Sequence, residues 1–424
     1  MRIAEATCYD NFLVLPCGHM KQIMTHFSAL PARVKSMLYL HWIYSFVGIL
    51  TGTFVQIYLY QRFESVTFNI IAQIIWFIGC ALGFSLIGAI VSWCRWNIKW
   101  GYLWAFIFSA LSFPILFGEV STYSALIFMF INGIGLGLYW LTLHTFELTE
   151  TRNHERDYYS SVLSAGDQIV SLCAPAFATL LFYLSEVVLH WDTFTLLFLV
   201  APLIYISGIP FFRTIPAYRP RPIDWHDLRH FLSDRRNRHA QVYLFASSAH
   251  FGLISVALPI ATFIMLGDAK EVGVYSTIFA VLSVFALLIL SRYRHAGSRM
   301  QFLFWTSIAS AFTTLVMVVR FDFAGFIVFS LLSVILNPLS RVSAHVIDLD
   351  TMETLAPKGK DFFPTMIFRD VAFGIWRVLA LIAFLWLTRM VGEGETAVRV
   401  SFVAIAISSA LLWVGARLIY QKAE

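Results

Sequence analysis

Charged residues are scarce in this chain of 424 amino acids. Asp, Glu, Lys and Arg together make up 13% of it, whereas hydrophobic residues make up 59%. Soluble domains carry about 25% charged residues, so this supply is too small for a water-facing surface. The composition therefore argues against a soluble enzyme, a nucleic-acid-binding protein and a disordered scaffold. The length instead suits about a dozen membrane helices of roughly 20 residues each.

Cysteines, glycosylation acceptors and a leader segment are also sparse or missing. Three of the five cysteines, Cys80, Cys94 and Cys173, lie in or beside apolar segments, so no disulfide framework is expected. The pattern Asn-x-Ser/Thr does not occur. The first 35 residues are polar and mixed, so we expect no cleavable signal peptide. These absences favour a bacterial inner membrane.

Apolar runs of about 18 residues or more predict twelve membrane spans. Their approximate ranges are 37–60, 69–93, 100–118, 122–146, 160–186, 193–213, 241–266, 271–291, 299–319, 322–347, 362–388 and 396–419. Segments of this length satisfy their backbone in hydrocarbon only as helices. The predicted fold class is therefore an all-α polytopic membrane protein with twelve transmembrane helices.

The distribution of Lys and Arg predicts the orientation. With the N-terminus inside, the cytoplasmic segments hold 22 of these residues and the opposite segments hold 5. Loops rich in Lys and Arg stay on the cytoplasmic side, so both termini are expected there.

The longest loop is also the most basic, and it divides the chain near its midpoint. The predicted organisation is a cytoplasmic segment 1–36, a six-helix half 37–213, a basic cytoplasmic linker 214–240 and a second six-helix half 241–420. Residues 224–232 could form an amphipathic helix on anionic headgroups, although a plain linker explains the charge as well.

The two halves share a sequence pattern. His144 and Glu147 end span four, and His345 and Asp348 end span ten at the same spacing. In both halves the next helix begins with a basic-Asp-aromatic-aromatic motif, and an acidic residue follows about ten residues later. These acidic residues are Asp167 and Asp370. The recurrence indicates an internal duplication.

With two six-helix halves and a cytoplasmic linker, the chain resembles the major facilitator superfamily of secondary transporters. The loop after span two keeps Gly88, Arg95 and Lys99 of that superfamily's signature, but Ser92 occupies its acidic position. Ala174-Pro175 matches the end of a helix-five antiporter pattern. The resemblance implies two pseudo-symmetric halves that rock about a central site.

Ionisable and polar side chains within spans are candidate functional groups, because burying them in a bilayer costs several kcal/mol unless they are paired or wetted. The candidates for substrate binding or coupling are His41, Asp167, Gln168, His250, Arg369, Asp370 and Arg377. Asp370 and Arg377 share a helix face about 10 Å apart, whereas Arg369 points about 100° away from Asp370. A desolvated Asp167 could carry a proton, or it could pair structurally with Arg369 or Arg377.

The inner ends of spans four and ten hold the candidate gating residues. These are His144, Glu147, Arg341, His345 and Asp348. In the superfamily that this chain resembles, such positions close an inward gate by contacts between halves. The two His-acid pairs could also form a divalent-metal site if the helix ends converge, although we predict no resident metal or cofactor.

The predicted function is secondary active transport of a small solute or ion, with proton coupling as one route. The alternatives are a divalent-metal transporter and a non-transporting receptor, assembly partner or lipid-handling protein on the same fold. No nucleophile and base converge in sequence, so an enzyme is not expected. The expected partners are membrane lipids and a small-molecule or ion substrate, without nucleic acid, and the protein is expected to be a monomer.

Overall fold

The computed structural model describes residues 30–150, 153–224, 226, 229, 231, 233, 235–291, 299–337 and 363–420. Nine helices in these residues are long and apolar enough to cross a membrane. Three shorter apolar helices accompany them, at Trp100–Leu116, Leu303–Val319 and Phe323–Asn337. The prediction of an all-helical membrane protein is confirmed.

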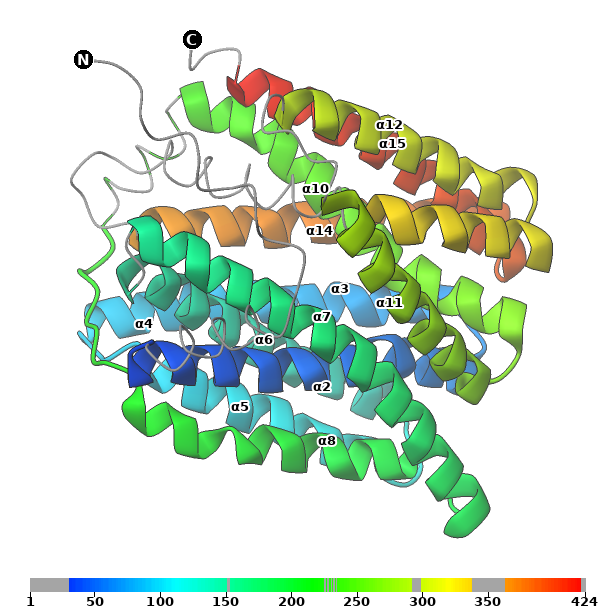
Figure 1. Cartoon of the computed structure of the whole chain (residues 1–424), viewed down its shortest axis with the longest axis horizontal. Coiled ribbons are helices and arrows are strands. Elements are labelled where there is room, and N and C mark those ends of the chain that lie inside the picture. The colour runs from blue at the N-terminus through cyan, green and yellow to red at the C-terminus, as the bar shows by residue number, and fades with distance from the viewer. Residues whose placement is uncertain are drawn as a thin grey trace.

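The helices alternate in direction along the bundle (Figure 1). The bounds of those before residue 215 are α2 Ala32–Phe63, α3 Val66–Leu82, α4 Gly88–Trp93, α5 Trp100–Ser112, α6 Thr122–Glu150, α7 Asn153–Tyr183 and α8 Thr195–Ser207. Short π-helical or 3₁₀ turns extend them at Gly83–Ile87, Phe113–Leu116, Leu184–Val188 and Ile209–Thr214. The later helices are α10 Arg235–Leu266, α11 Ala269–Ser291, α12 Arg299–Val319, the helix Phe323–Asn337, α14 Phe363–Val391 and α15 Glu395–Tyr420.

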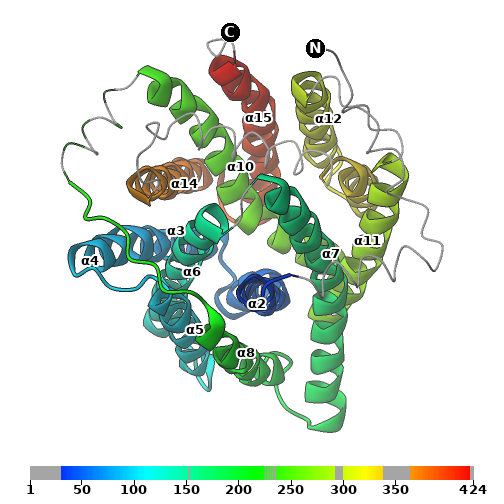
Figure 2. The same cartoon turned by 60° about the vertical axis from the view of Figure 1, so that its left-hand side comes forward.

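We call the helices up to residue 214 the N-terminal set and those from residue 235 the C-terminal set. Figure 2 shows α12 and α15 on the opposite side of the bundle from α5 and α8, whereas α10 runs into the middle, where it packs against α2. The end at which α2 begins and residue 214 lies is the linker end, and the end at which α2 meets α3 is the far end.

Glycines allow α3 and α6 to pack backbone to backbone. A Cβ on Gly79 would lie 2.4 Å from the carbonyl oxygen of Phe130, and one on Gly137 would lie 2.2 Å from that of Cys80. Small residues four apart permit this close approach in membrane helices. By contrast, Gly48 and Gly52 of α2 have the same spacing, but no heavy atom of the described residues lies within 4 Å of such a Cβ. Both glycines are exposed, so this face of α2 is open at these positions.

The two sets meet through close helix crossings. α14 packs against α3, and α7 packs against α11, as both views of the bundle show (Figures 1 and 2). A Cβ on Gly273 of α11 would lie 2.2 Å from Thr179 Oγ1 of α7. Gly88, the glycine kept from the loop signature, faces Ile367 of α14. Each crossing therefore leaves little room for a larger residue.

Two polar contacts join the sets at the far end. Glu393 lies between Gly392 and Gly394, both with positive φ, and its Oε2 accepts from the backbone N–H groups of Val66 (3.0 Å) and Thr67 (3.2 Å). The carboxylate thus caps the first turn of α3, where free N–H groups and the helix dipole favour a negative charge. The second contact is the ion pair between Lys270 Nζ and Glu186 Oε2, at 2.5 Å.

At the linker end, the start of the linker is tied to the loop before α5. Asn97 Oδ1 accepts from the backbone N–H of Tyr218 (3.0 Å), and the Ile98 N–H donates to the Tyr218 carbonyl (2.9 Å). Ser92 of the same region is buried and donates to Ala89 O. The helix α10 begins at Arg235, which is earlier than the predicted start at 241.

Candidate functional site

The first cluster of predicted site residues joins α2 to α7. His41 Nε2 lies 2.9 Å from Asp167 Oδ1, and its Nδ1 lies 2.5 Å from the hydroxyl of Tyr139 on α6. His41 is buried, whereas the Asp167 side chain is 38% exposed. Asp167 is therefore less desolvated than expected. Its ion-pair partner among the described residues is His41, and not Arg369 or Arg377, which were the alternatives.

The geometry assigns a donor role to one nitrogen of His41. A carboxylate only accepts hydrogen bonds, so Nε2 carries a proton and donates to Asp167. In the neutral ring Nδ1 accepts from the Tyr139 hydroxyl, and in the charged ring it donates to it.

A glycine sets the register that brings His41 to Asp167. Gly166 lies beneath the indole of Trp42, where a Cβ would be 2.0 Å from Nε1. That nitrogen donates to the carbonyl of Leu163 at 3.3 Å. Trp42 directly follows His41, and Gly166 directly precedes Asp167. The packing of Trp42 on Gly166 therefore positions His41 beside Asp167.

The second cluster lies where α6 of the N-terminal set meets α14 of the C-terminal set. Asp370 Oδ1 accepts from Arg369 Nε (2.9 Å) and Nη2 (2.6 Å), and Asp370 Oδ2 lies 3.4 Å from His144 Nδ1. Arg369 and Asp370 are each only 5% exposed. The expectation that Arg369 points away from Asp370 is wrong, because its long side chain folds back onto the neighbouring carboxylate.

The charge balance of this cluster depends on Asp370. The ionised carboxylate neutralises Arg369 through Oδ1, and its Oδ2 faces His144. Protonation of Asp370 removes the only negative charge in this trio and leaves a cation beside His144. The contact between α6 and α14 is therefore strongest when Asp370 is charged.

Arg377 lies among three aromatic rings. Its guanidinium carbon lies 5.2 Å from the ring centre of Phe77, 4.8 Å from that of Phe251 and 5.4 Å from that of Phe373. These rings come from α3, α10 and α14. Cation–π attraction of this kind stabilises a desolvated cation where the two sets meet.

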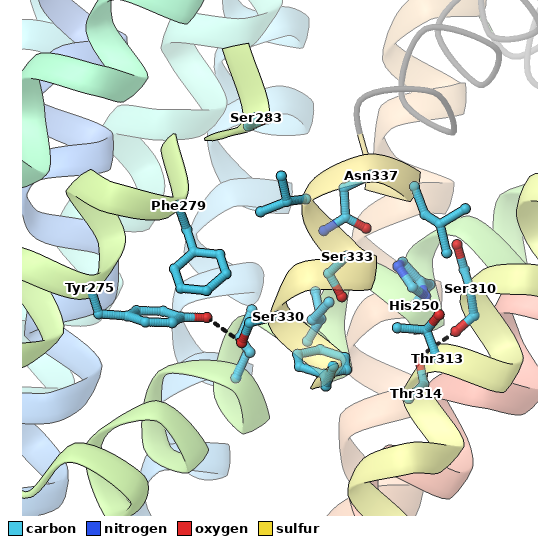
Figure 3. A pocket seen from close by; sticks show the side chains of 15 residues that line it. His250, Tyr275, Phe279, Ser283, Ser310, Thr313, Thr314, Ser330, Ser333 and Asn337 are labelled. Atoms are coloured by element: carbon cyan, nitrogen blue, oxygen red, sulfur yellow. Dashed lines mark hydrogen bonds between the residues drawn. The ribbon is translucent and has the colours of Figure 1, made fainter. Parts of the chain in front are cut away.

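His250 borders a cavity inside the C-terminal set. The cavity is about 230 Å³ in volume and is lined by residues of α10, α11, α12 and the helix Phe323–Asn337. Figure 3 shows the side chains that surround it. His250 Nδ1 lies 3.0 Å from Ser409 Oγ on α15. His250 is thus held by α15 while it lines the cavity.

The remaining predicted residues are not brought into these clusters. Glu147 Oε1 accepts from the Tyr159 hydroxyl at 3.4 Å, and Gln168 is partly buried next to Asp167. Arg341, His345 and Asp348 lie outside the described residues, so the gate and the metal site that include them stay predictions. Within the described part of the chain, no group of three or more His, Cys, Asp or Glu residues could hold a metal ion.

Sequence reasoning missed Glu393, Glu186 and Tyr139 as members of polar contacts. The glycines on both sides of Glu393 were the available signal, since a Gly-Glu-Gly turn presents its carboxylate on a short loop. Tyr139 gave no signal beyond its place in an aromatic run, because its hydroxyl meets His41 only through the tertiary fold.

Several solved structures share this fold at low sequence identity. One is the nucleoside transporter NupG, with 10% identity over 92% of this chain and 99% of that chain, and a TM-score of 0.63. A peptide-bound POT family transporter has 10% identity over 90% and 94% of the two chains, with a TM-score of 0.65. The human organic anion transporter MFSD10 (TETRAN) has 12% identity over 92% and 99%, with a TM-score of 0.63.

A search of curated protein sequences finds no match to this chain. The sequence profile of one family, however, matches residues 37–349, which is most of its length. That match agrees with the loop glycine Gly88 and with the helical fold. The chain belongs to the Major Facilitator Superfamily.

Proposed function

We propose that this protein is a secondary active transporter that moves a small solute by alternating access, and that proton binding at Asp370 drives the change. The N-terminal and C-terminal sets would be two six-helix halves of a twelve-helix protein, in a bacterial inner membrane with both termini cytoplasmic. The family and the fold support transport. The observation that carries the coupling step is the buried Asp370, in contact with a histidine of the opposite set.

Alternating access requires contacts between the halves that break at one end while others form. At the far end the halves are joined by Glu393 and by the pair Lys270–Glu186. Nearer the linker end the contact between His144 and Asp370 joins them. A proton taken up by Asp370 weakens the second contact, and its release restores it. Proton binding would thus select between the two arrangements.

The first test measures transport with purified protein in proteoliposomes under an imposed pH gradient. The probes are uridine, dialanine, succinate and glucose, which cover the nucleoside, peptide and organic anion classes named for the similar structures, together with a neutral sugar. We expect one of them to accumulate and to carry protons, as reported by a trapped pH dye. Asp370→Asn should abolish accumulation but retain exchange of solute, whereas Asp322→Asn, in an exposed pair, should retain both.

A second measurement does not depend on the substrate. With the natural cysteines replaced, Gly48→Cys places a thiol on the open face of α2. An impermeant thiol reagent should reach it from opposite sides of the membrane at high and low pH. If no probe moves and Gly48→Cys reacts from one side at every pH, the protein does not transport, and a receptor on this fold becomes the better interpretation.

A further inference from the structure

The cavity inside the C-terminal set lies apart from the charged clusters. None of its described lining residues is Asp, Glu, Lys or Arg. A charged molecule placed there would lose its hydration without gaining an opposite charge, which costs several kcal/mol in a low-dielectric site. The occupant that suits this lining is therefore electrically neutral.

The lining is nevertheless rich in hydrogen-bonding groups. Hydroxyls come from three helices, at Ser283, Ser310, Thr313, Thr314, Ser330 and Ser333. Thr314 and Ser330 are satisfied within their own helices, because each donates to a carbonyl four residues earlier. Within the described residues, the side chains of Ser283, Ser333 and Asn337 make no hydrogen bond, and Figure 3 shows Ser333 and Asn337 on one side of the cavity.

His250 adds an acceptor to these groups. The single hydroxyl proton of Ser409 goes to the Ile405 carbonyl at 2.8 Å, so Ser409 Oγ accepts from His250 Nδ1. A neutral ring protonated at Nδ1 carries a free lone pair at Nε2. The cavity thus offers an imidazole acceptor, an amide that both donates and accepts, and hydroxyls that do either.

Aromatic side chains complete the lining. Tyr275 and Phe279 of α11 and Phe329 of the facing helix border the cavity, and the Tyr275 hydroxyl lies 2.6 Å from Ser330 Oγ. This bond joins two of the four helices beside the cavity (Figure 3). The apolar C–H face of a sugar or cyclitol packs well against such rings, while its hydroxyls reach the polar groups.

From this chemistry we propose that the cavity binds a neutral, polyhydroxylated molecule of about monosaccharide size. The volume of about 230 Å³ lies below the range of roughly 300–1,000 Å³ for drug-sized ligands, so the occupant is small. The site lies within one set of helices and binding there does not require transport. The inference therefore stands or falls separately from the proposed transport function.

The test measures binding to the purified full-length protein in detergent, by calorimetry and by thermal shift. The neutral probes are glucose, xylose and myo-inositol, and the charged probes of similar size are gluconate and glucosamine. We expect at least one neutral probe to bind and to raise the melting temperature, with no effect of the charged probes. Failure of every neutral probe, or equal effects of neutral and charged probes, would mean a cavity that holds water only.

Matched variants locate the binding. Ser333→Val and Asn337→Leu each remove a polar group and should weaken binding about fivefold, since one hydrogen bond contributes about 1 kcal/mol. Thr262→Val removes a hydroxyl of α10 that donates to its own helix and does not line the cavity, so it should leave the Kd unchanged. Ser283→Val tests the same cavity from α11, in case the variants in the helix Phe323–Asn337 do not fold. Unchanged binding in all three cavity variants would overturn the assignment.

Binding without uptake in proteoliposomes would support this site while removing support for transport. Uptake of another solute without binding of any neutral polyol would support transport and overturn the proposed binding site.

Discussion

At the scale of single residues, Asp167 and Asp370 each lie beside a basic side chain. Asp370 is held by Arg369 and His144, and Asp167 is held by His41. The two carboxylates differ in access to water, because the Asp370 side chain is 5% exposed and that of Asp167 is 38% exposed. The carboxylate of Asp167 is therefore open to water, whereas that of Asp370 is enclosed by its neighbours.

The buried pair predicts a strong asymmetry between single and double substitutions. Asp370→Asn leaves Arg369 charged without its partner and should lower the free energy of unfolding by about 3–5 kcal/mol. The double change Arg369→Leu with Asp370→Leu removes both charges and should cost much less. Unfolding followed by tryptophan fluorescence in mixed detergent measures both. A double variant as unstable as the single one would show that the pair itself stabilises the fold.

The contact beneath Trp42 predicts a loss of coupling from a small change. Gly166→Ala places a methyl group within 2.0 Å of Trp42 Nε1, so the indole must move and the register of α2 on α7 changes. We expect solute accumulation under an imposed pH gradient to fall in proteoliposomes, because His41 no longer meets Asp167. Gly52→Ala on the open face of α2 is the control and should leave accumulation unchanged.

At the scale of helices, glycine has opposite roles in α2 and α3. Glycines of α3 and α6 lie against the backbone of the partner helix, whereas those of α2 face open space. The same Gly-x-x-x-Gly spacing occurs in α2 and in α3, so spacing alone could not separate the two cases. The difference is set by which face a neighbouring helix covers.

This difference predicts that alanine substitutions in the two helices change the stability of the protein in opposite directions. A Cβ on Gly83 would lie 2.6 Å from the carbonyl oxygen of Ile134, so Gly83→Ala must push α3 and α6 apart and should destabilise the protein by roughly 1–3 kcal/mol. Gly48→Ala meets no atom within 4 Å and should stabilise α2 by up to about 1 kcal/mol. Melting temperatures in one detergent compare them, and a loss of stability in Gly48→Ala would contradict the open face.

At the scale of the whole molecule, the sequence predicted the class of fold and the family better than the partners of each side chain. The length of the apolar segments and the scarcity of charge can be read from each segment alone. They do not depend on how the helices pack together. The contacts of Asp167 and Arg369 depend on which helices are neighbours and how they are rotated. Neither is encoded by spacing along one helix, so His41 as the partner of Asp167 could not be predicted.

The links at the far end predict that joining the sets there stops transport. In a background without natural cysteines, Glu186→Cys with Lys270→Cys should react with a short thiol crosslinker and lose solute exchange, because α7 and α11 can no longer separate. Reduction of a disulfide-containing crosslinker should restore it. Glu186→Cys with Thr193→Cys joins two contacting residues of the N-terminal set and should leave exchange intact. Full activity in the crosslinked first variant would exclude movement at this end.

The hydrogen bonds of Tyr218 to Asn97 and Ile98 also bear on chain continuity. They hold the start of the linker with the N-terminal set, so only the stretch between Tyr218 and Arg235 connects the sets covalently. Phe231 is buried and packs against Phe368 of α14, and its carbonyl accepts from Asn237 Nδ2 at 2.6 Å, so this part of the linker is held by the C-terminal set. The polypeptide could therefore be severed between the two attachments. Two fragments, made as separate chains that end and begin near residue 220, should find each other in one membrane and assemble through the helix contacts between the sets, the crossings of α3 with α14 and α7 with α11 among them.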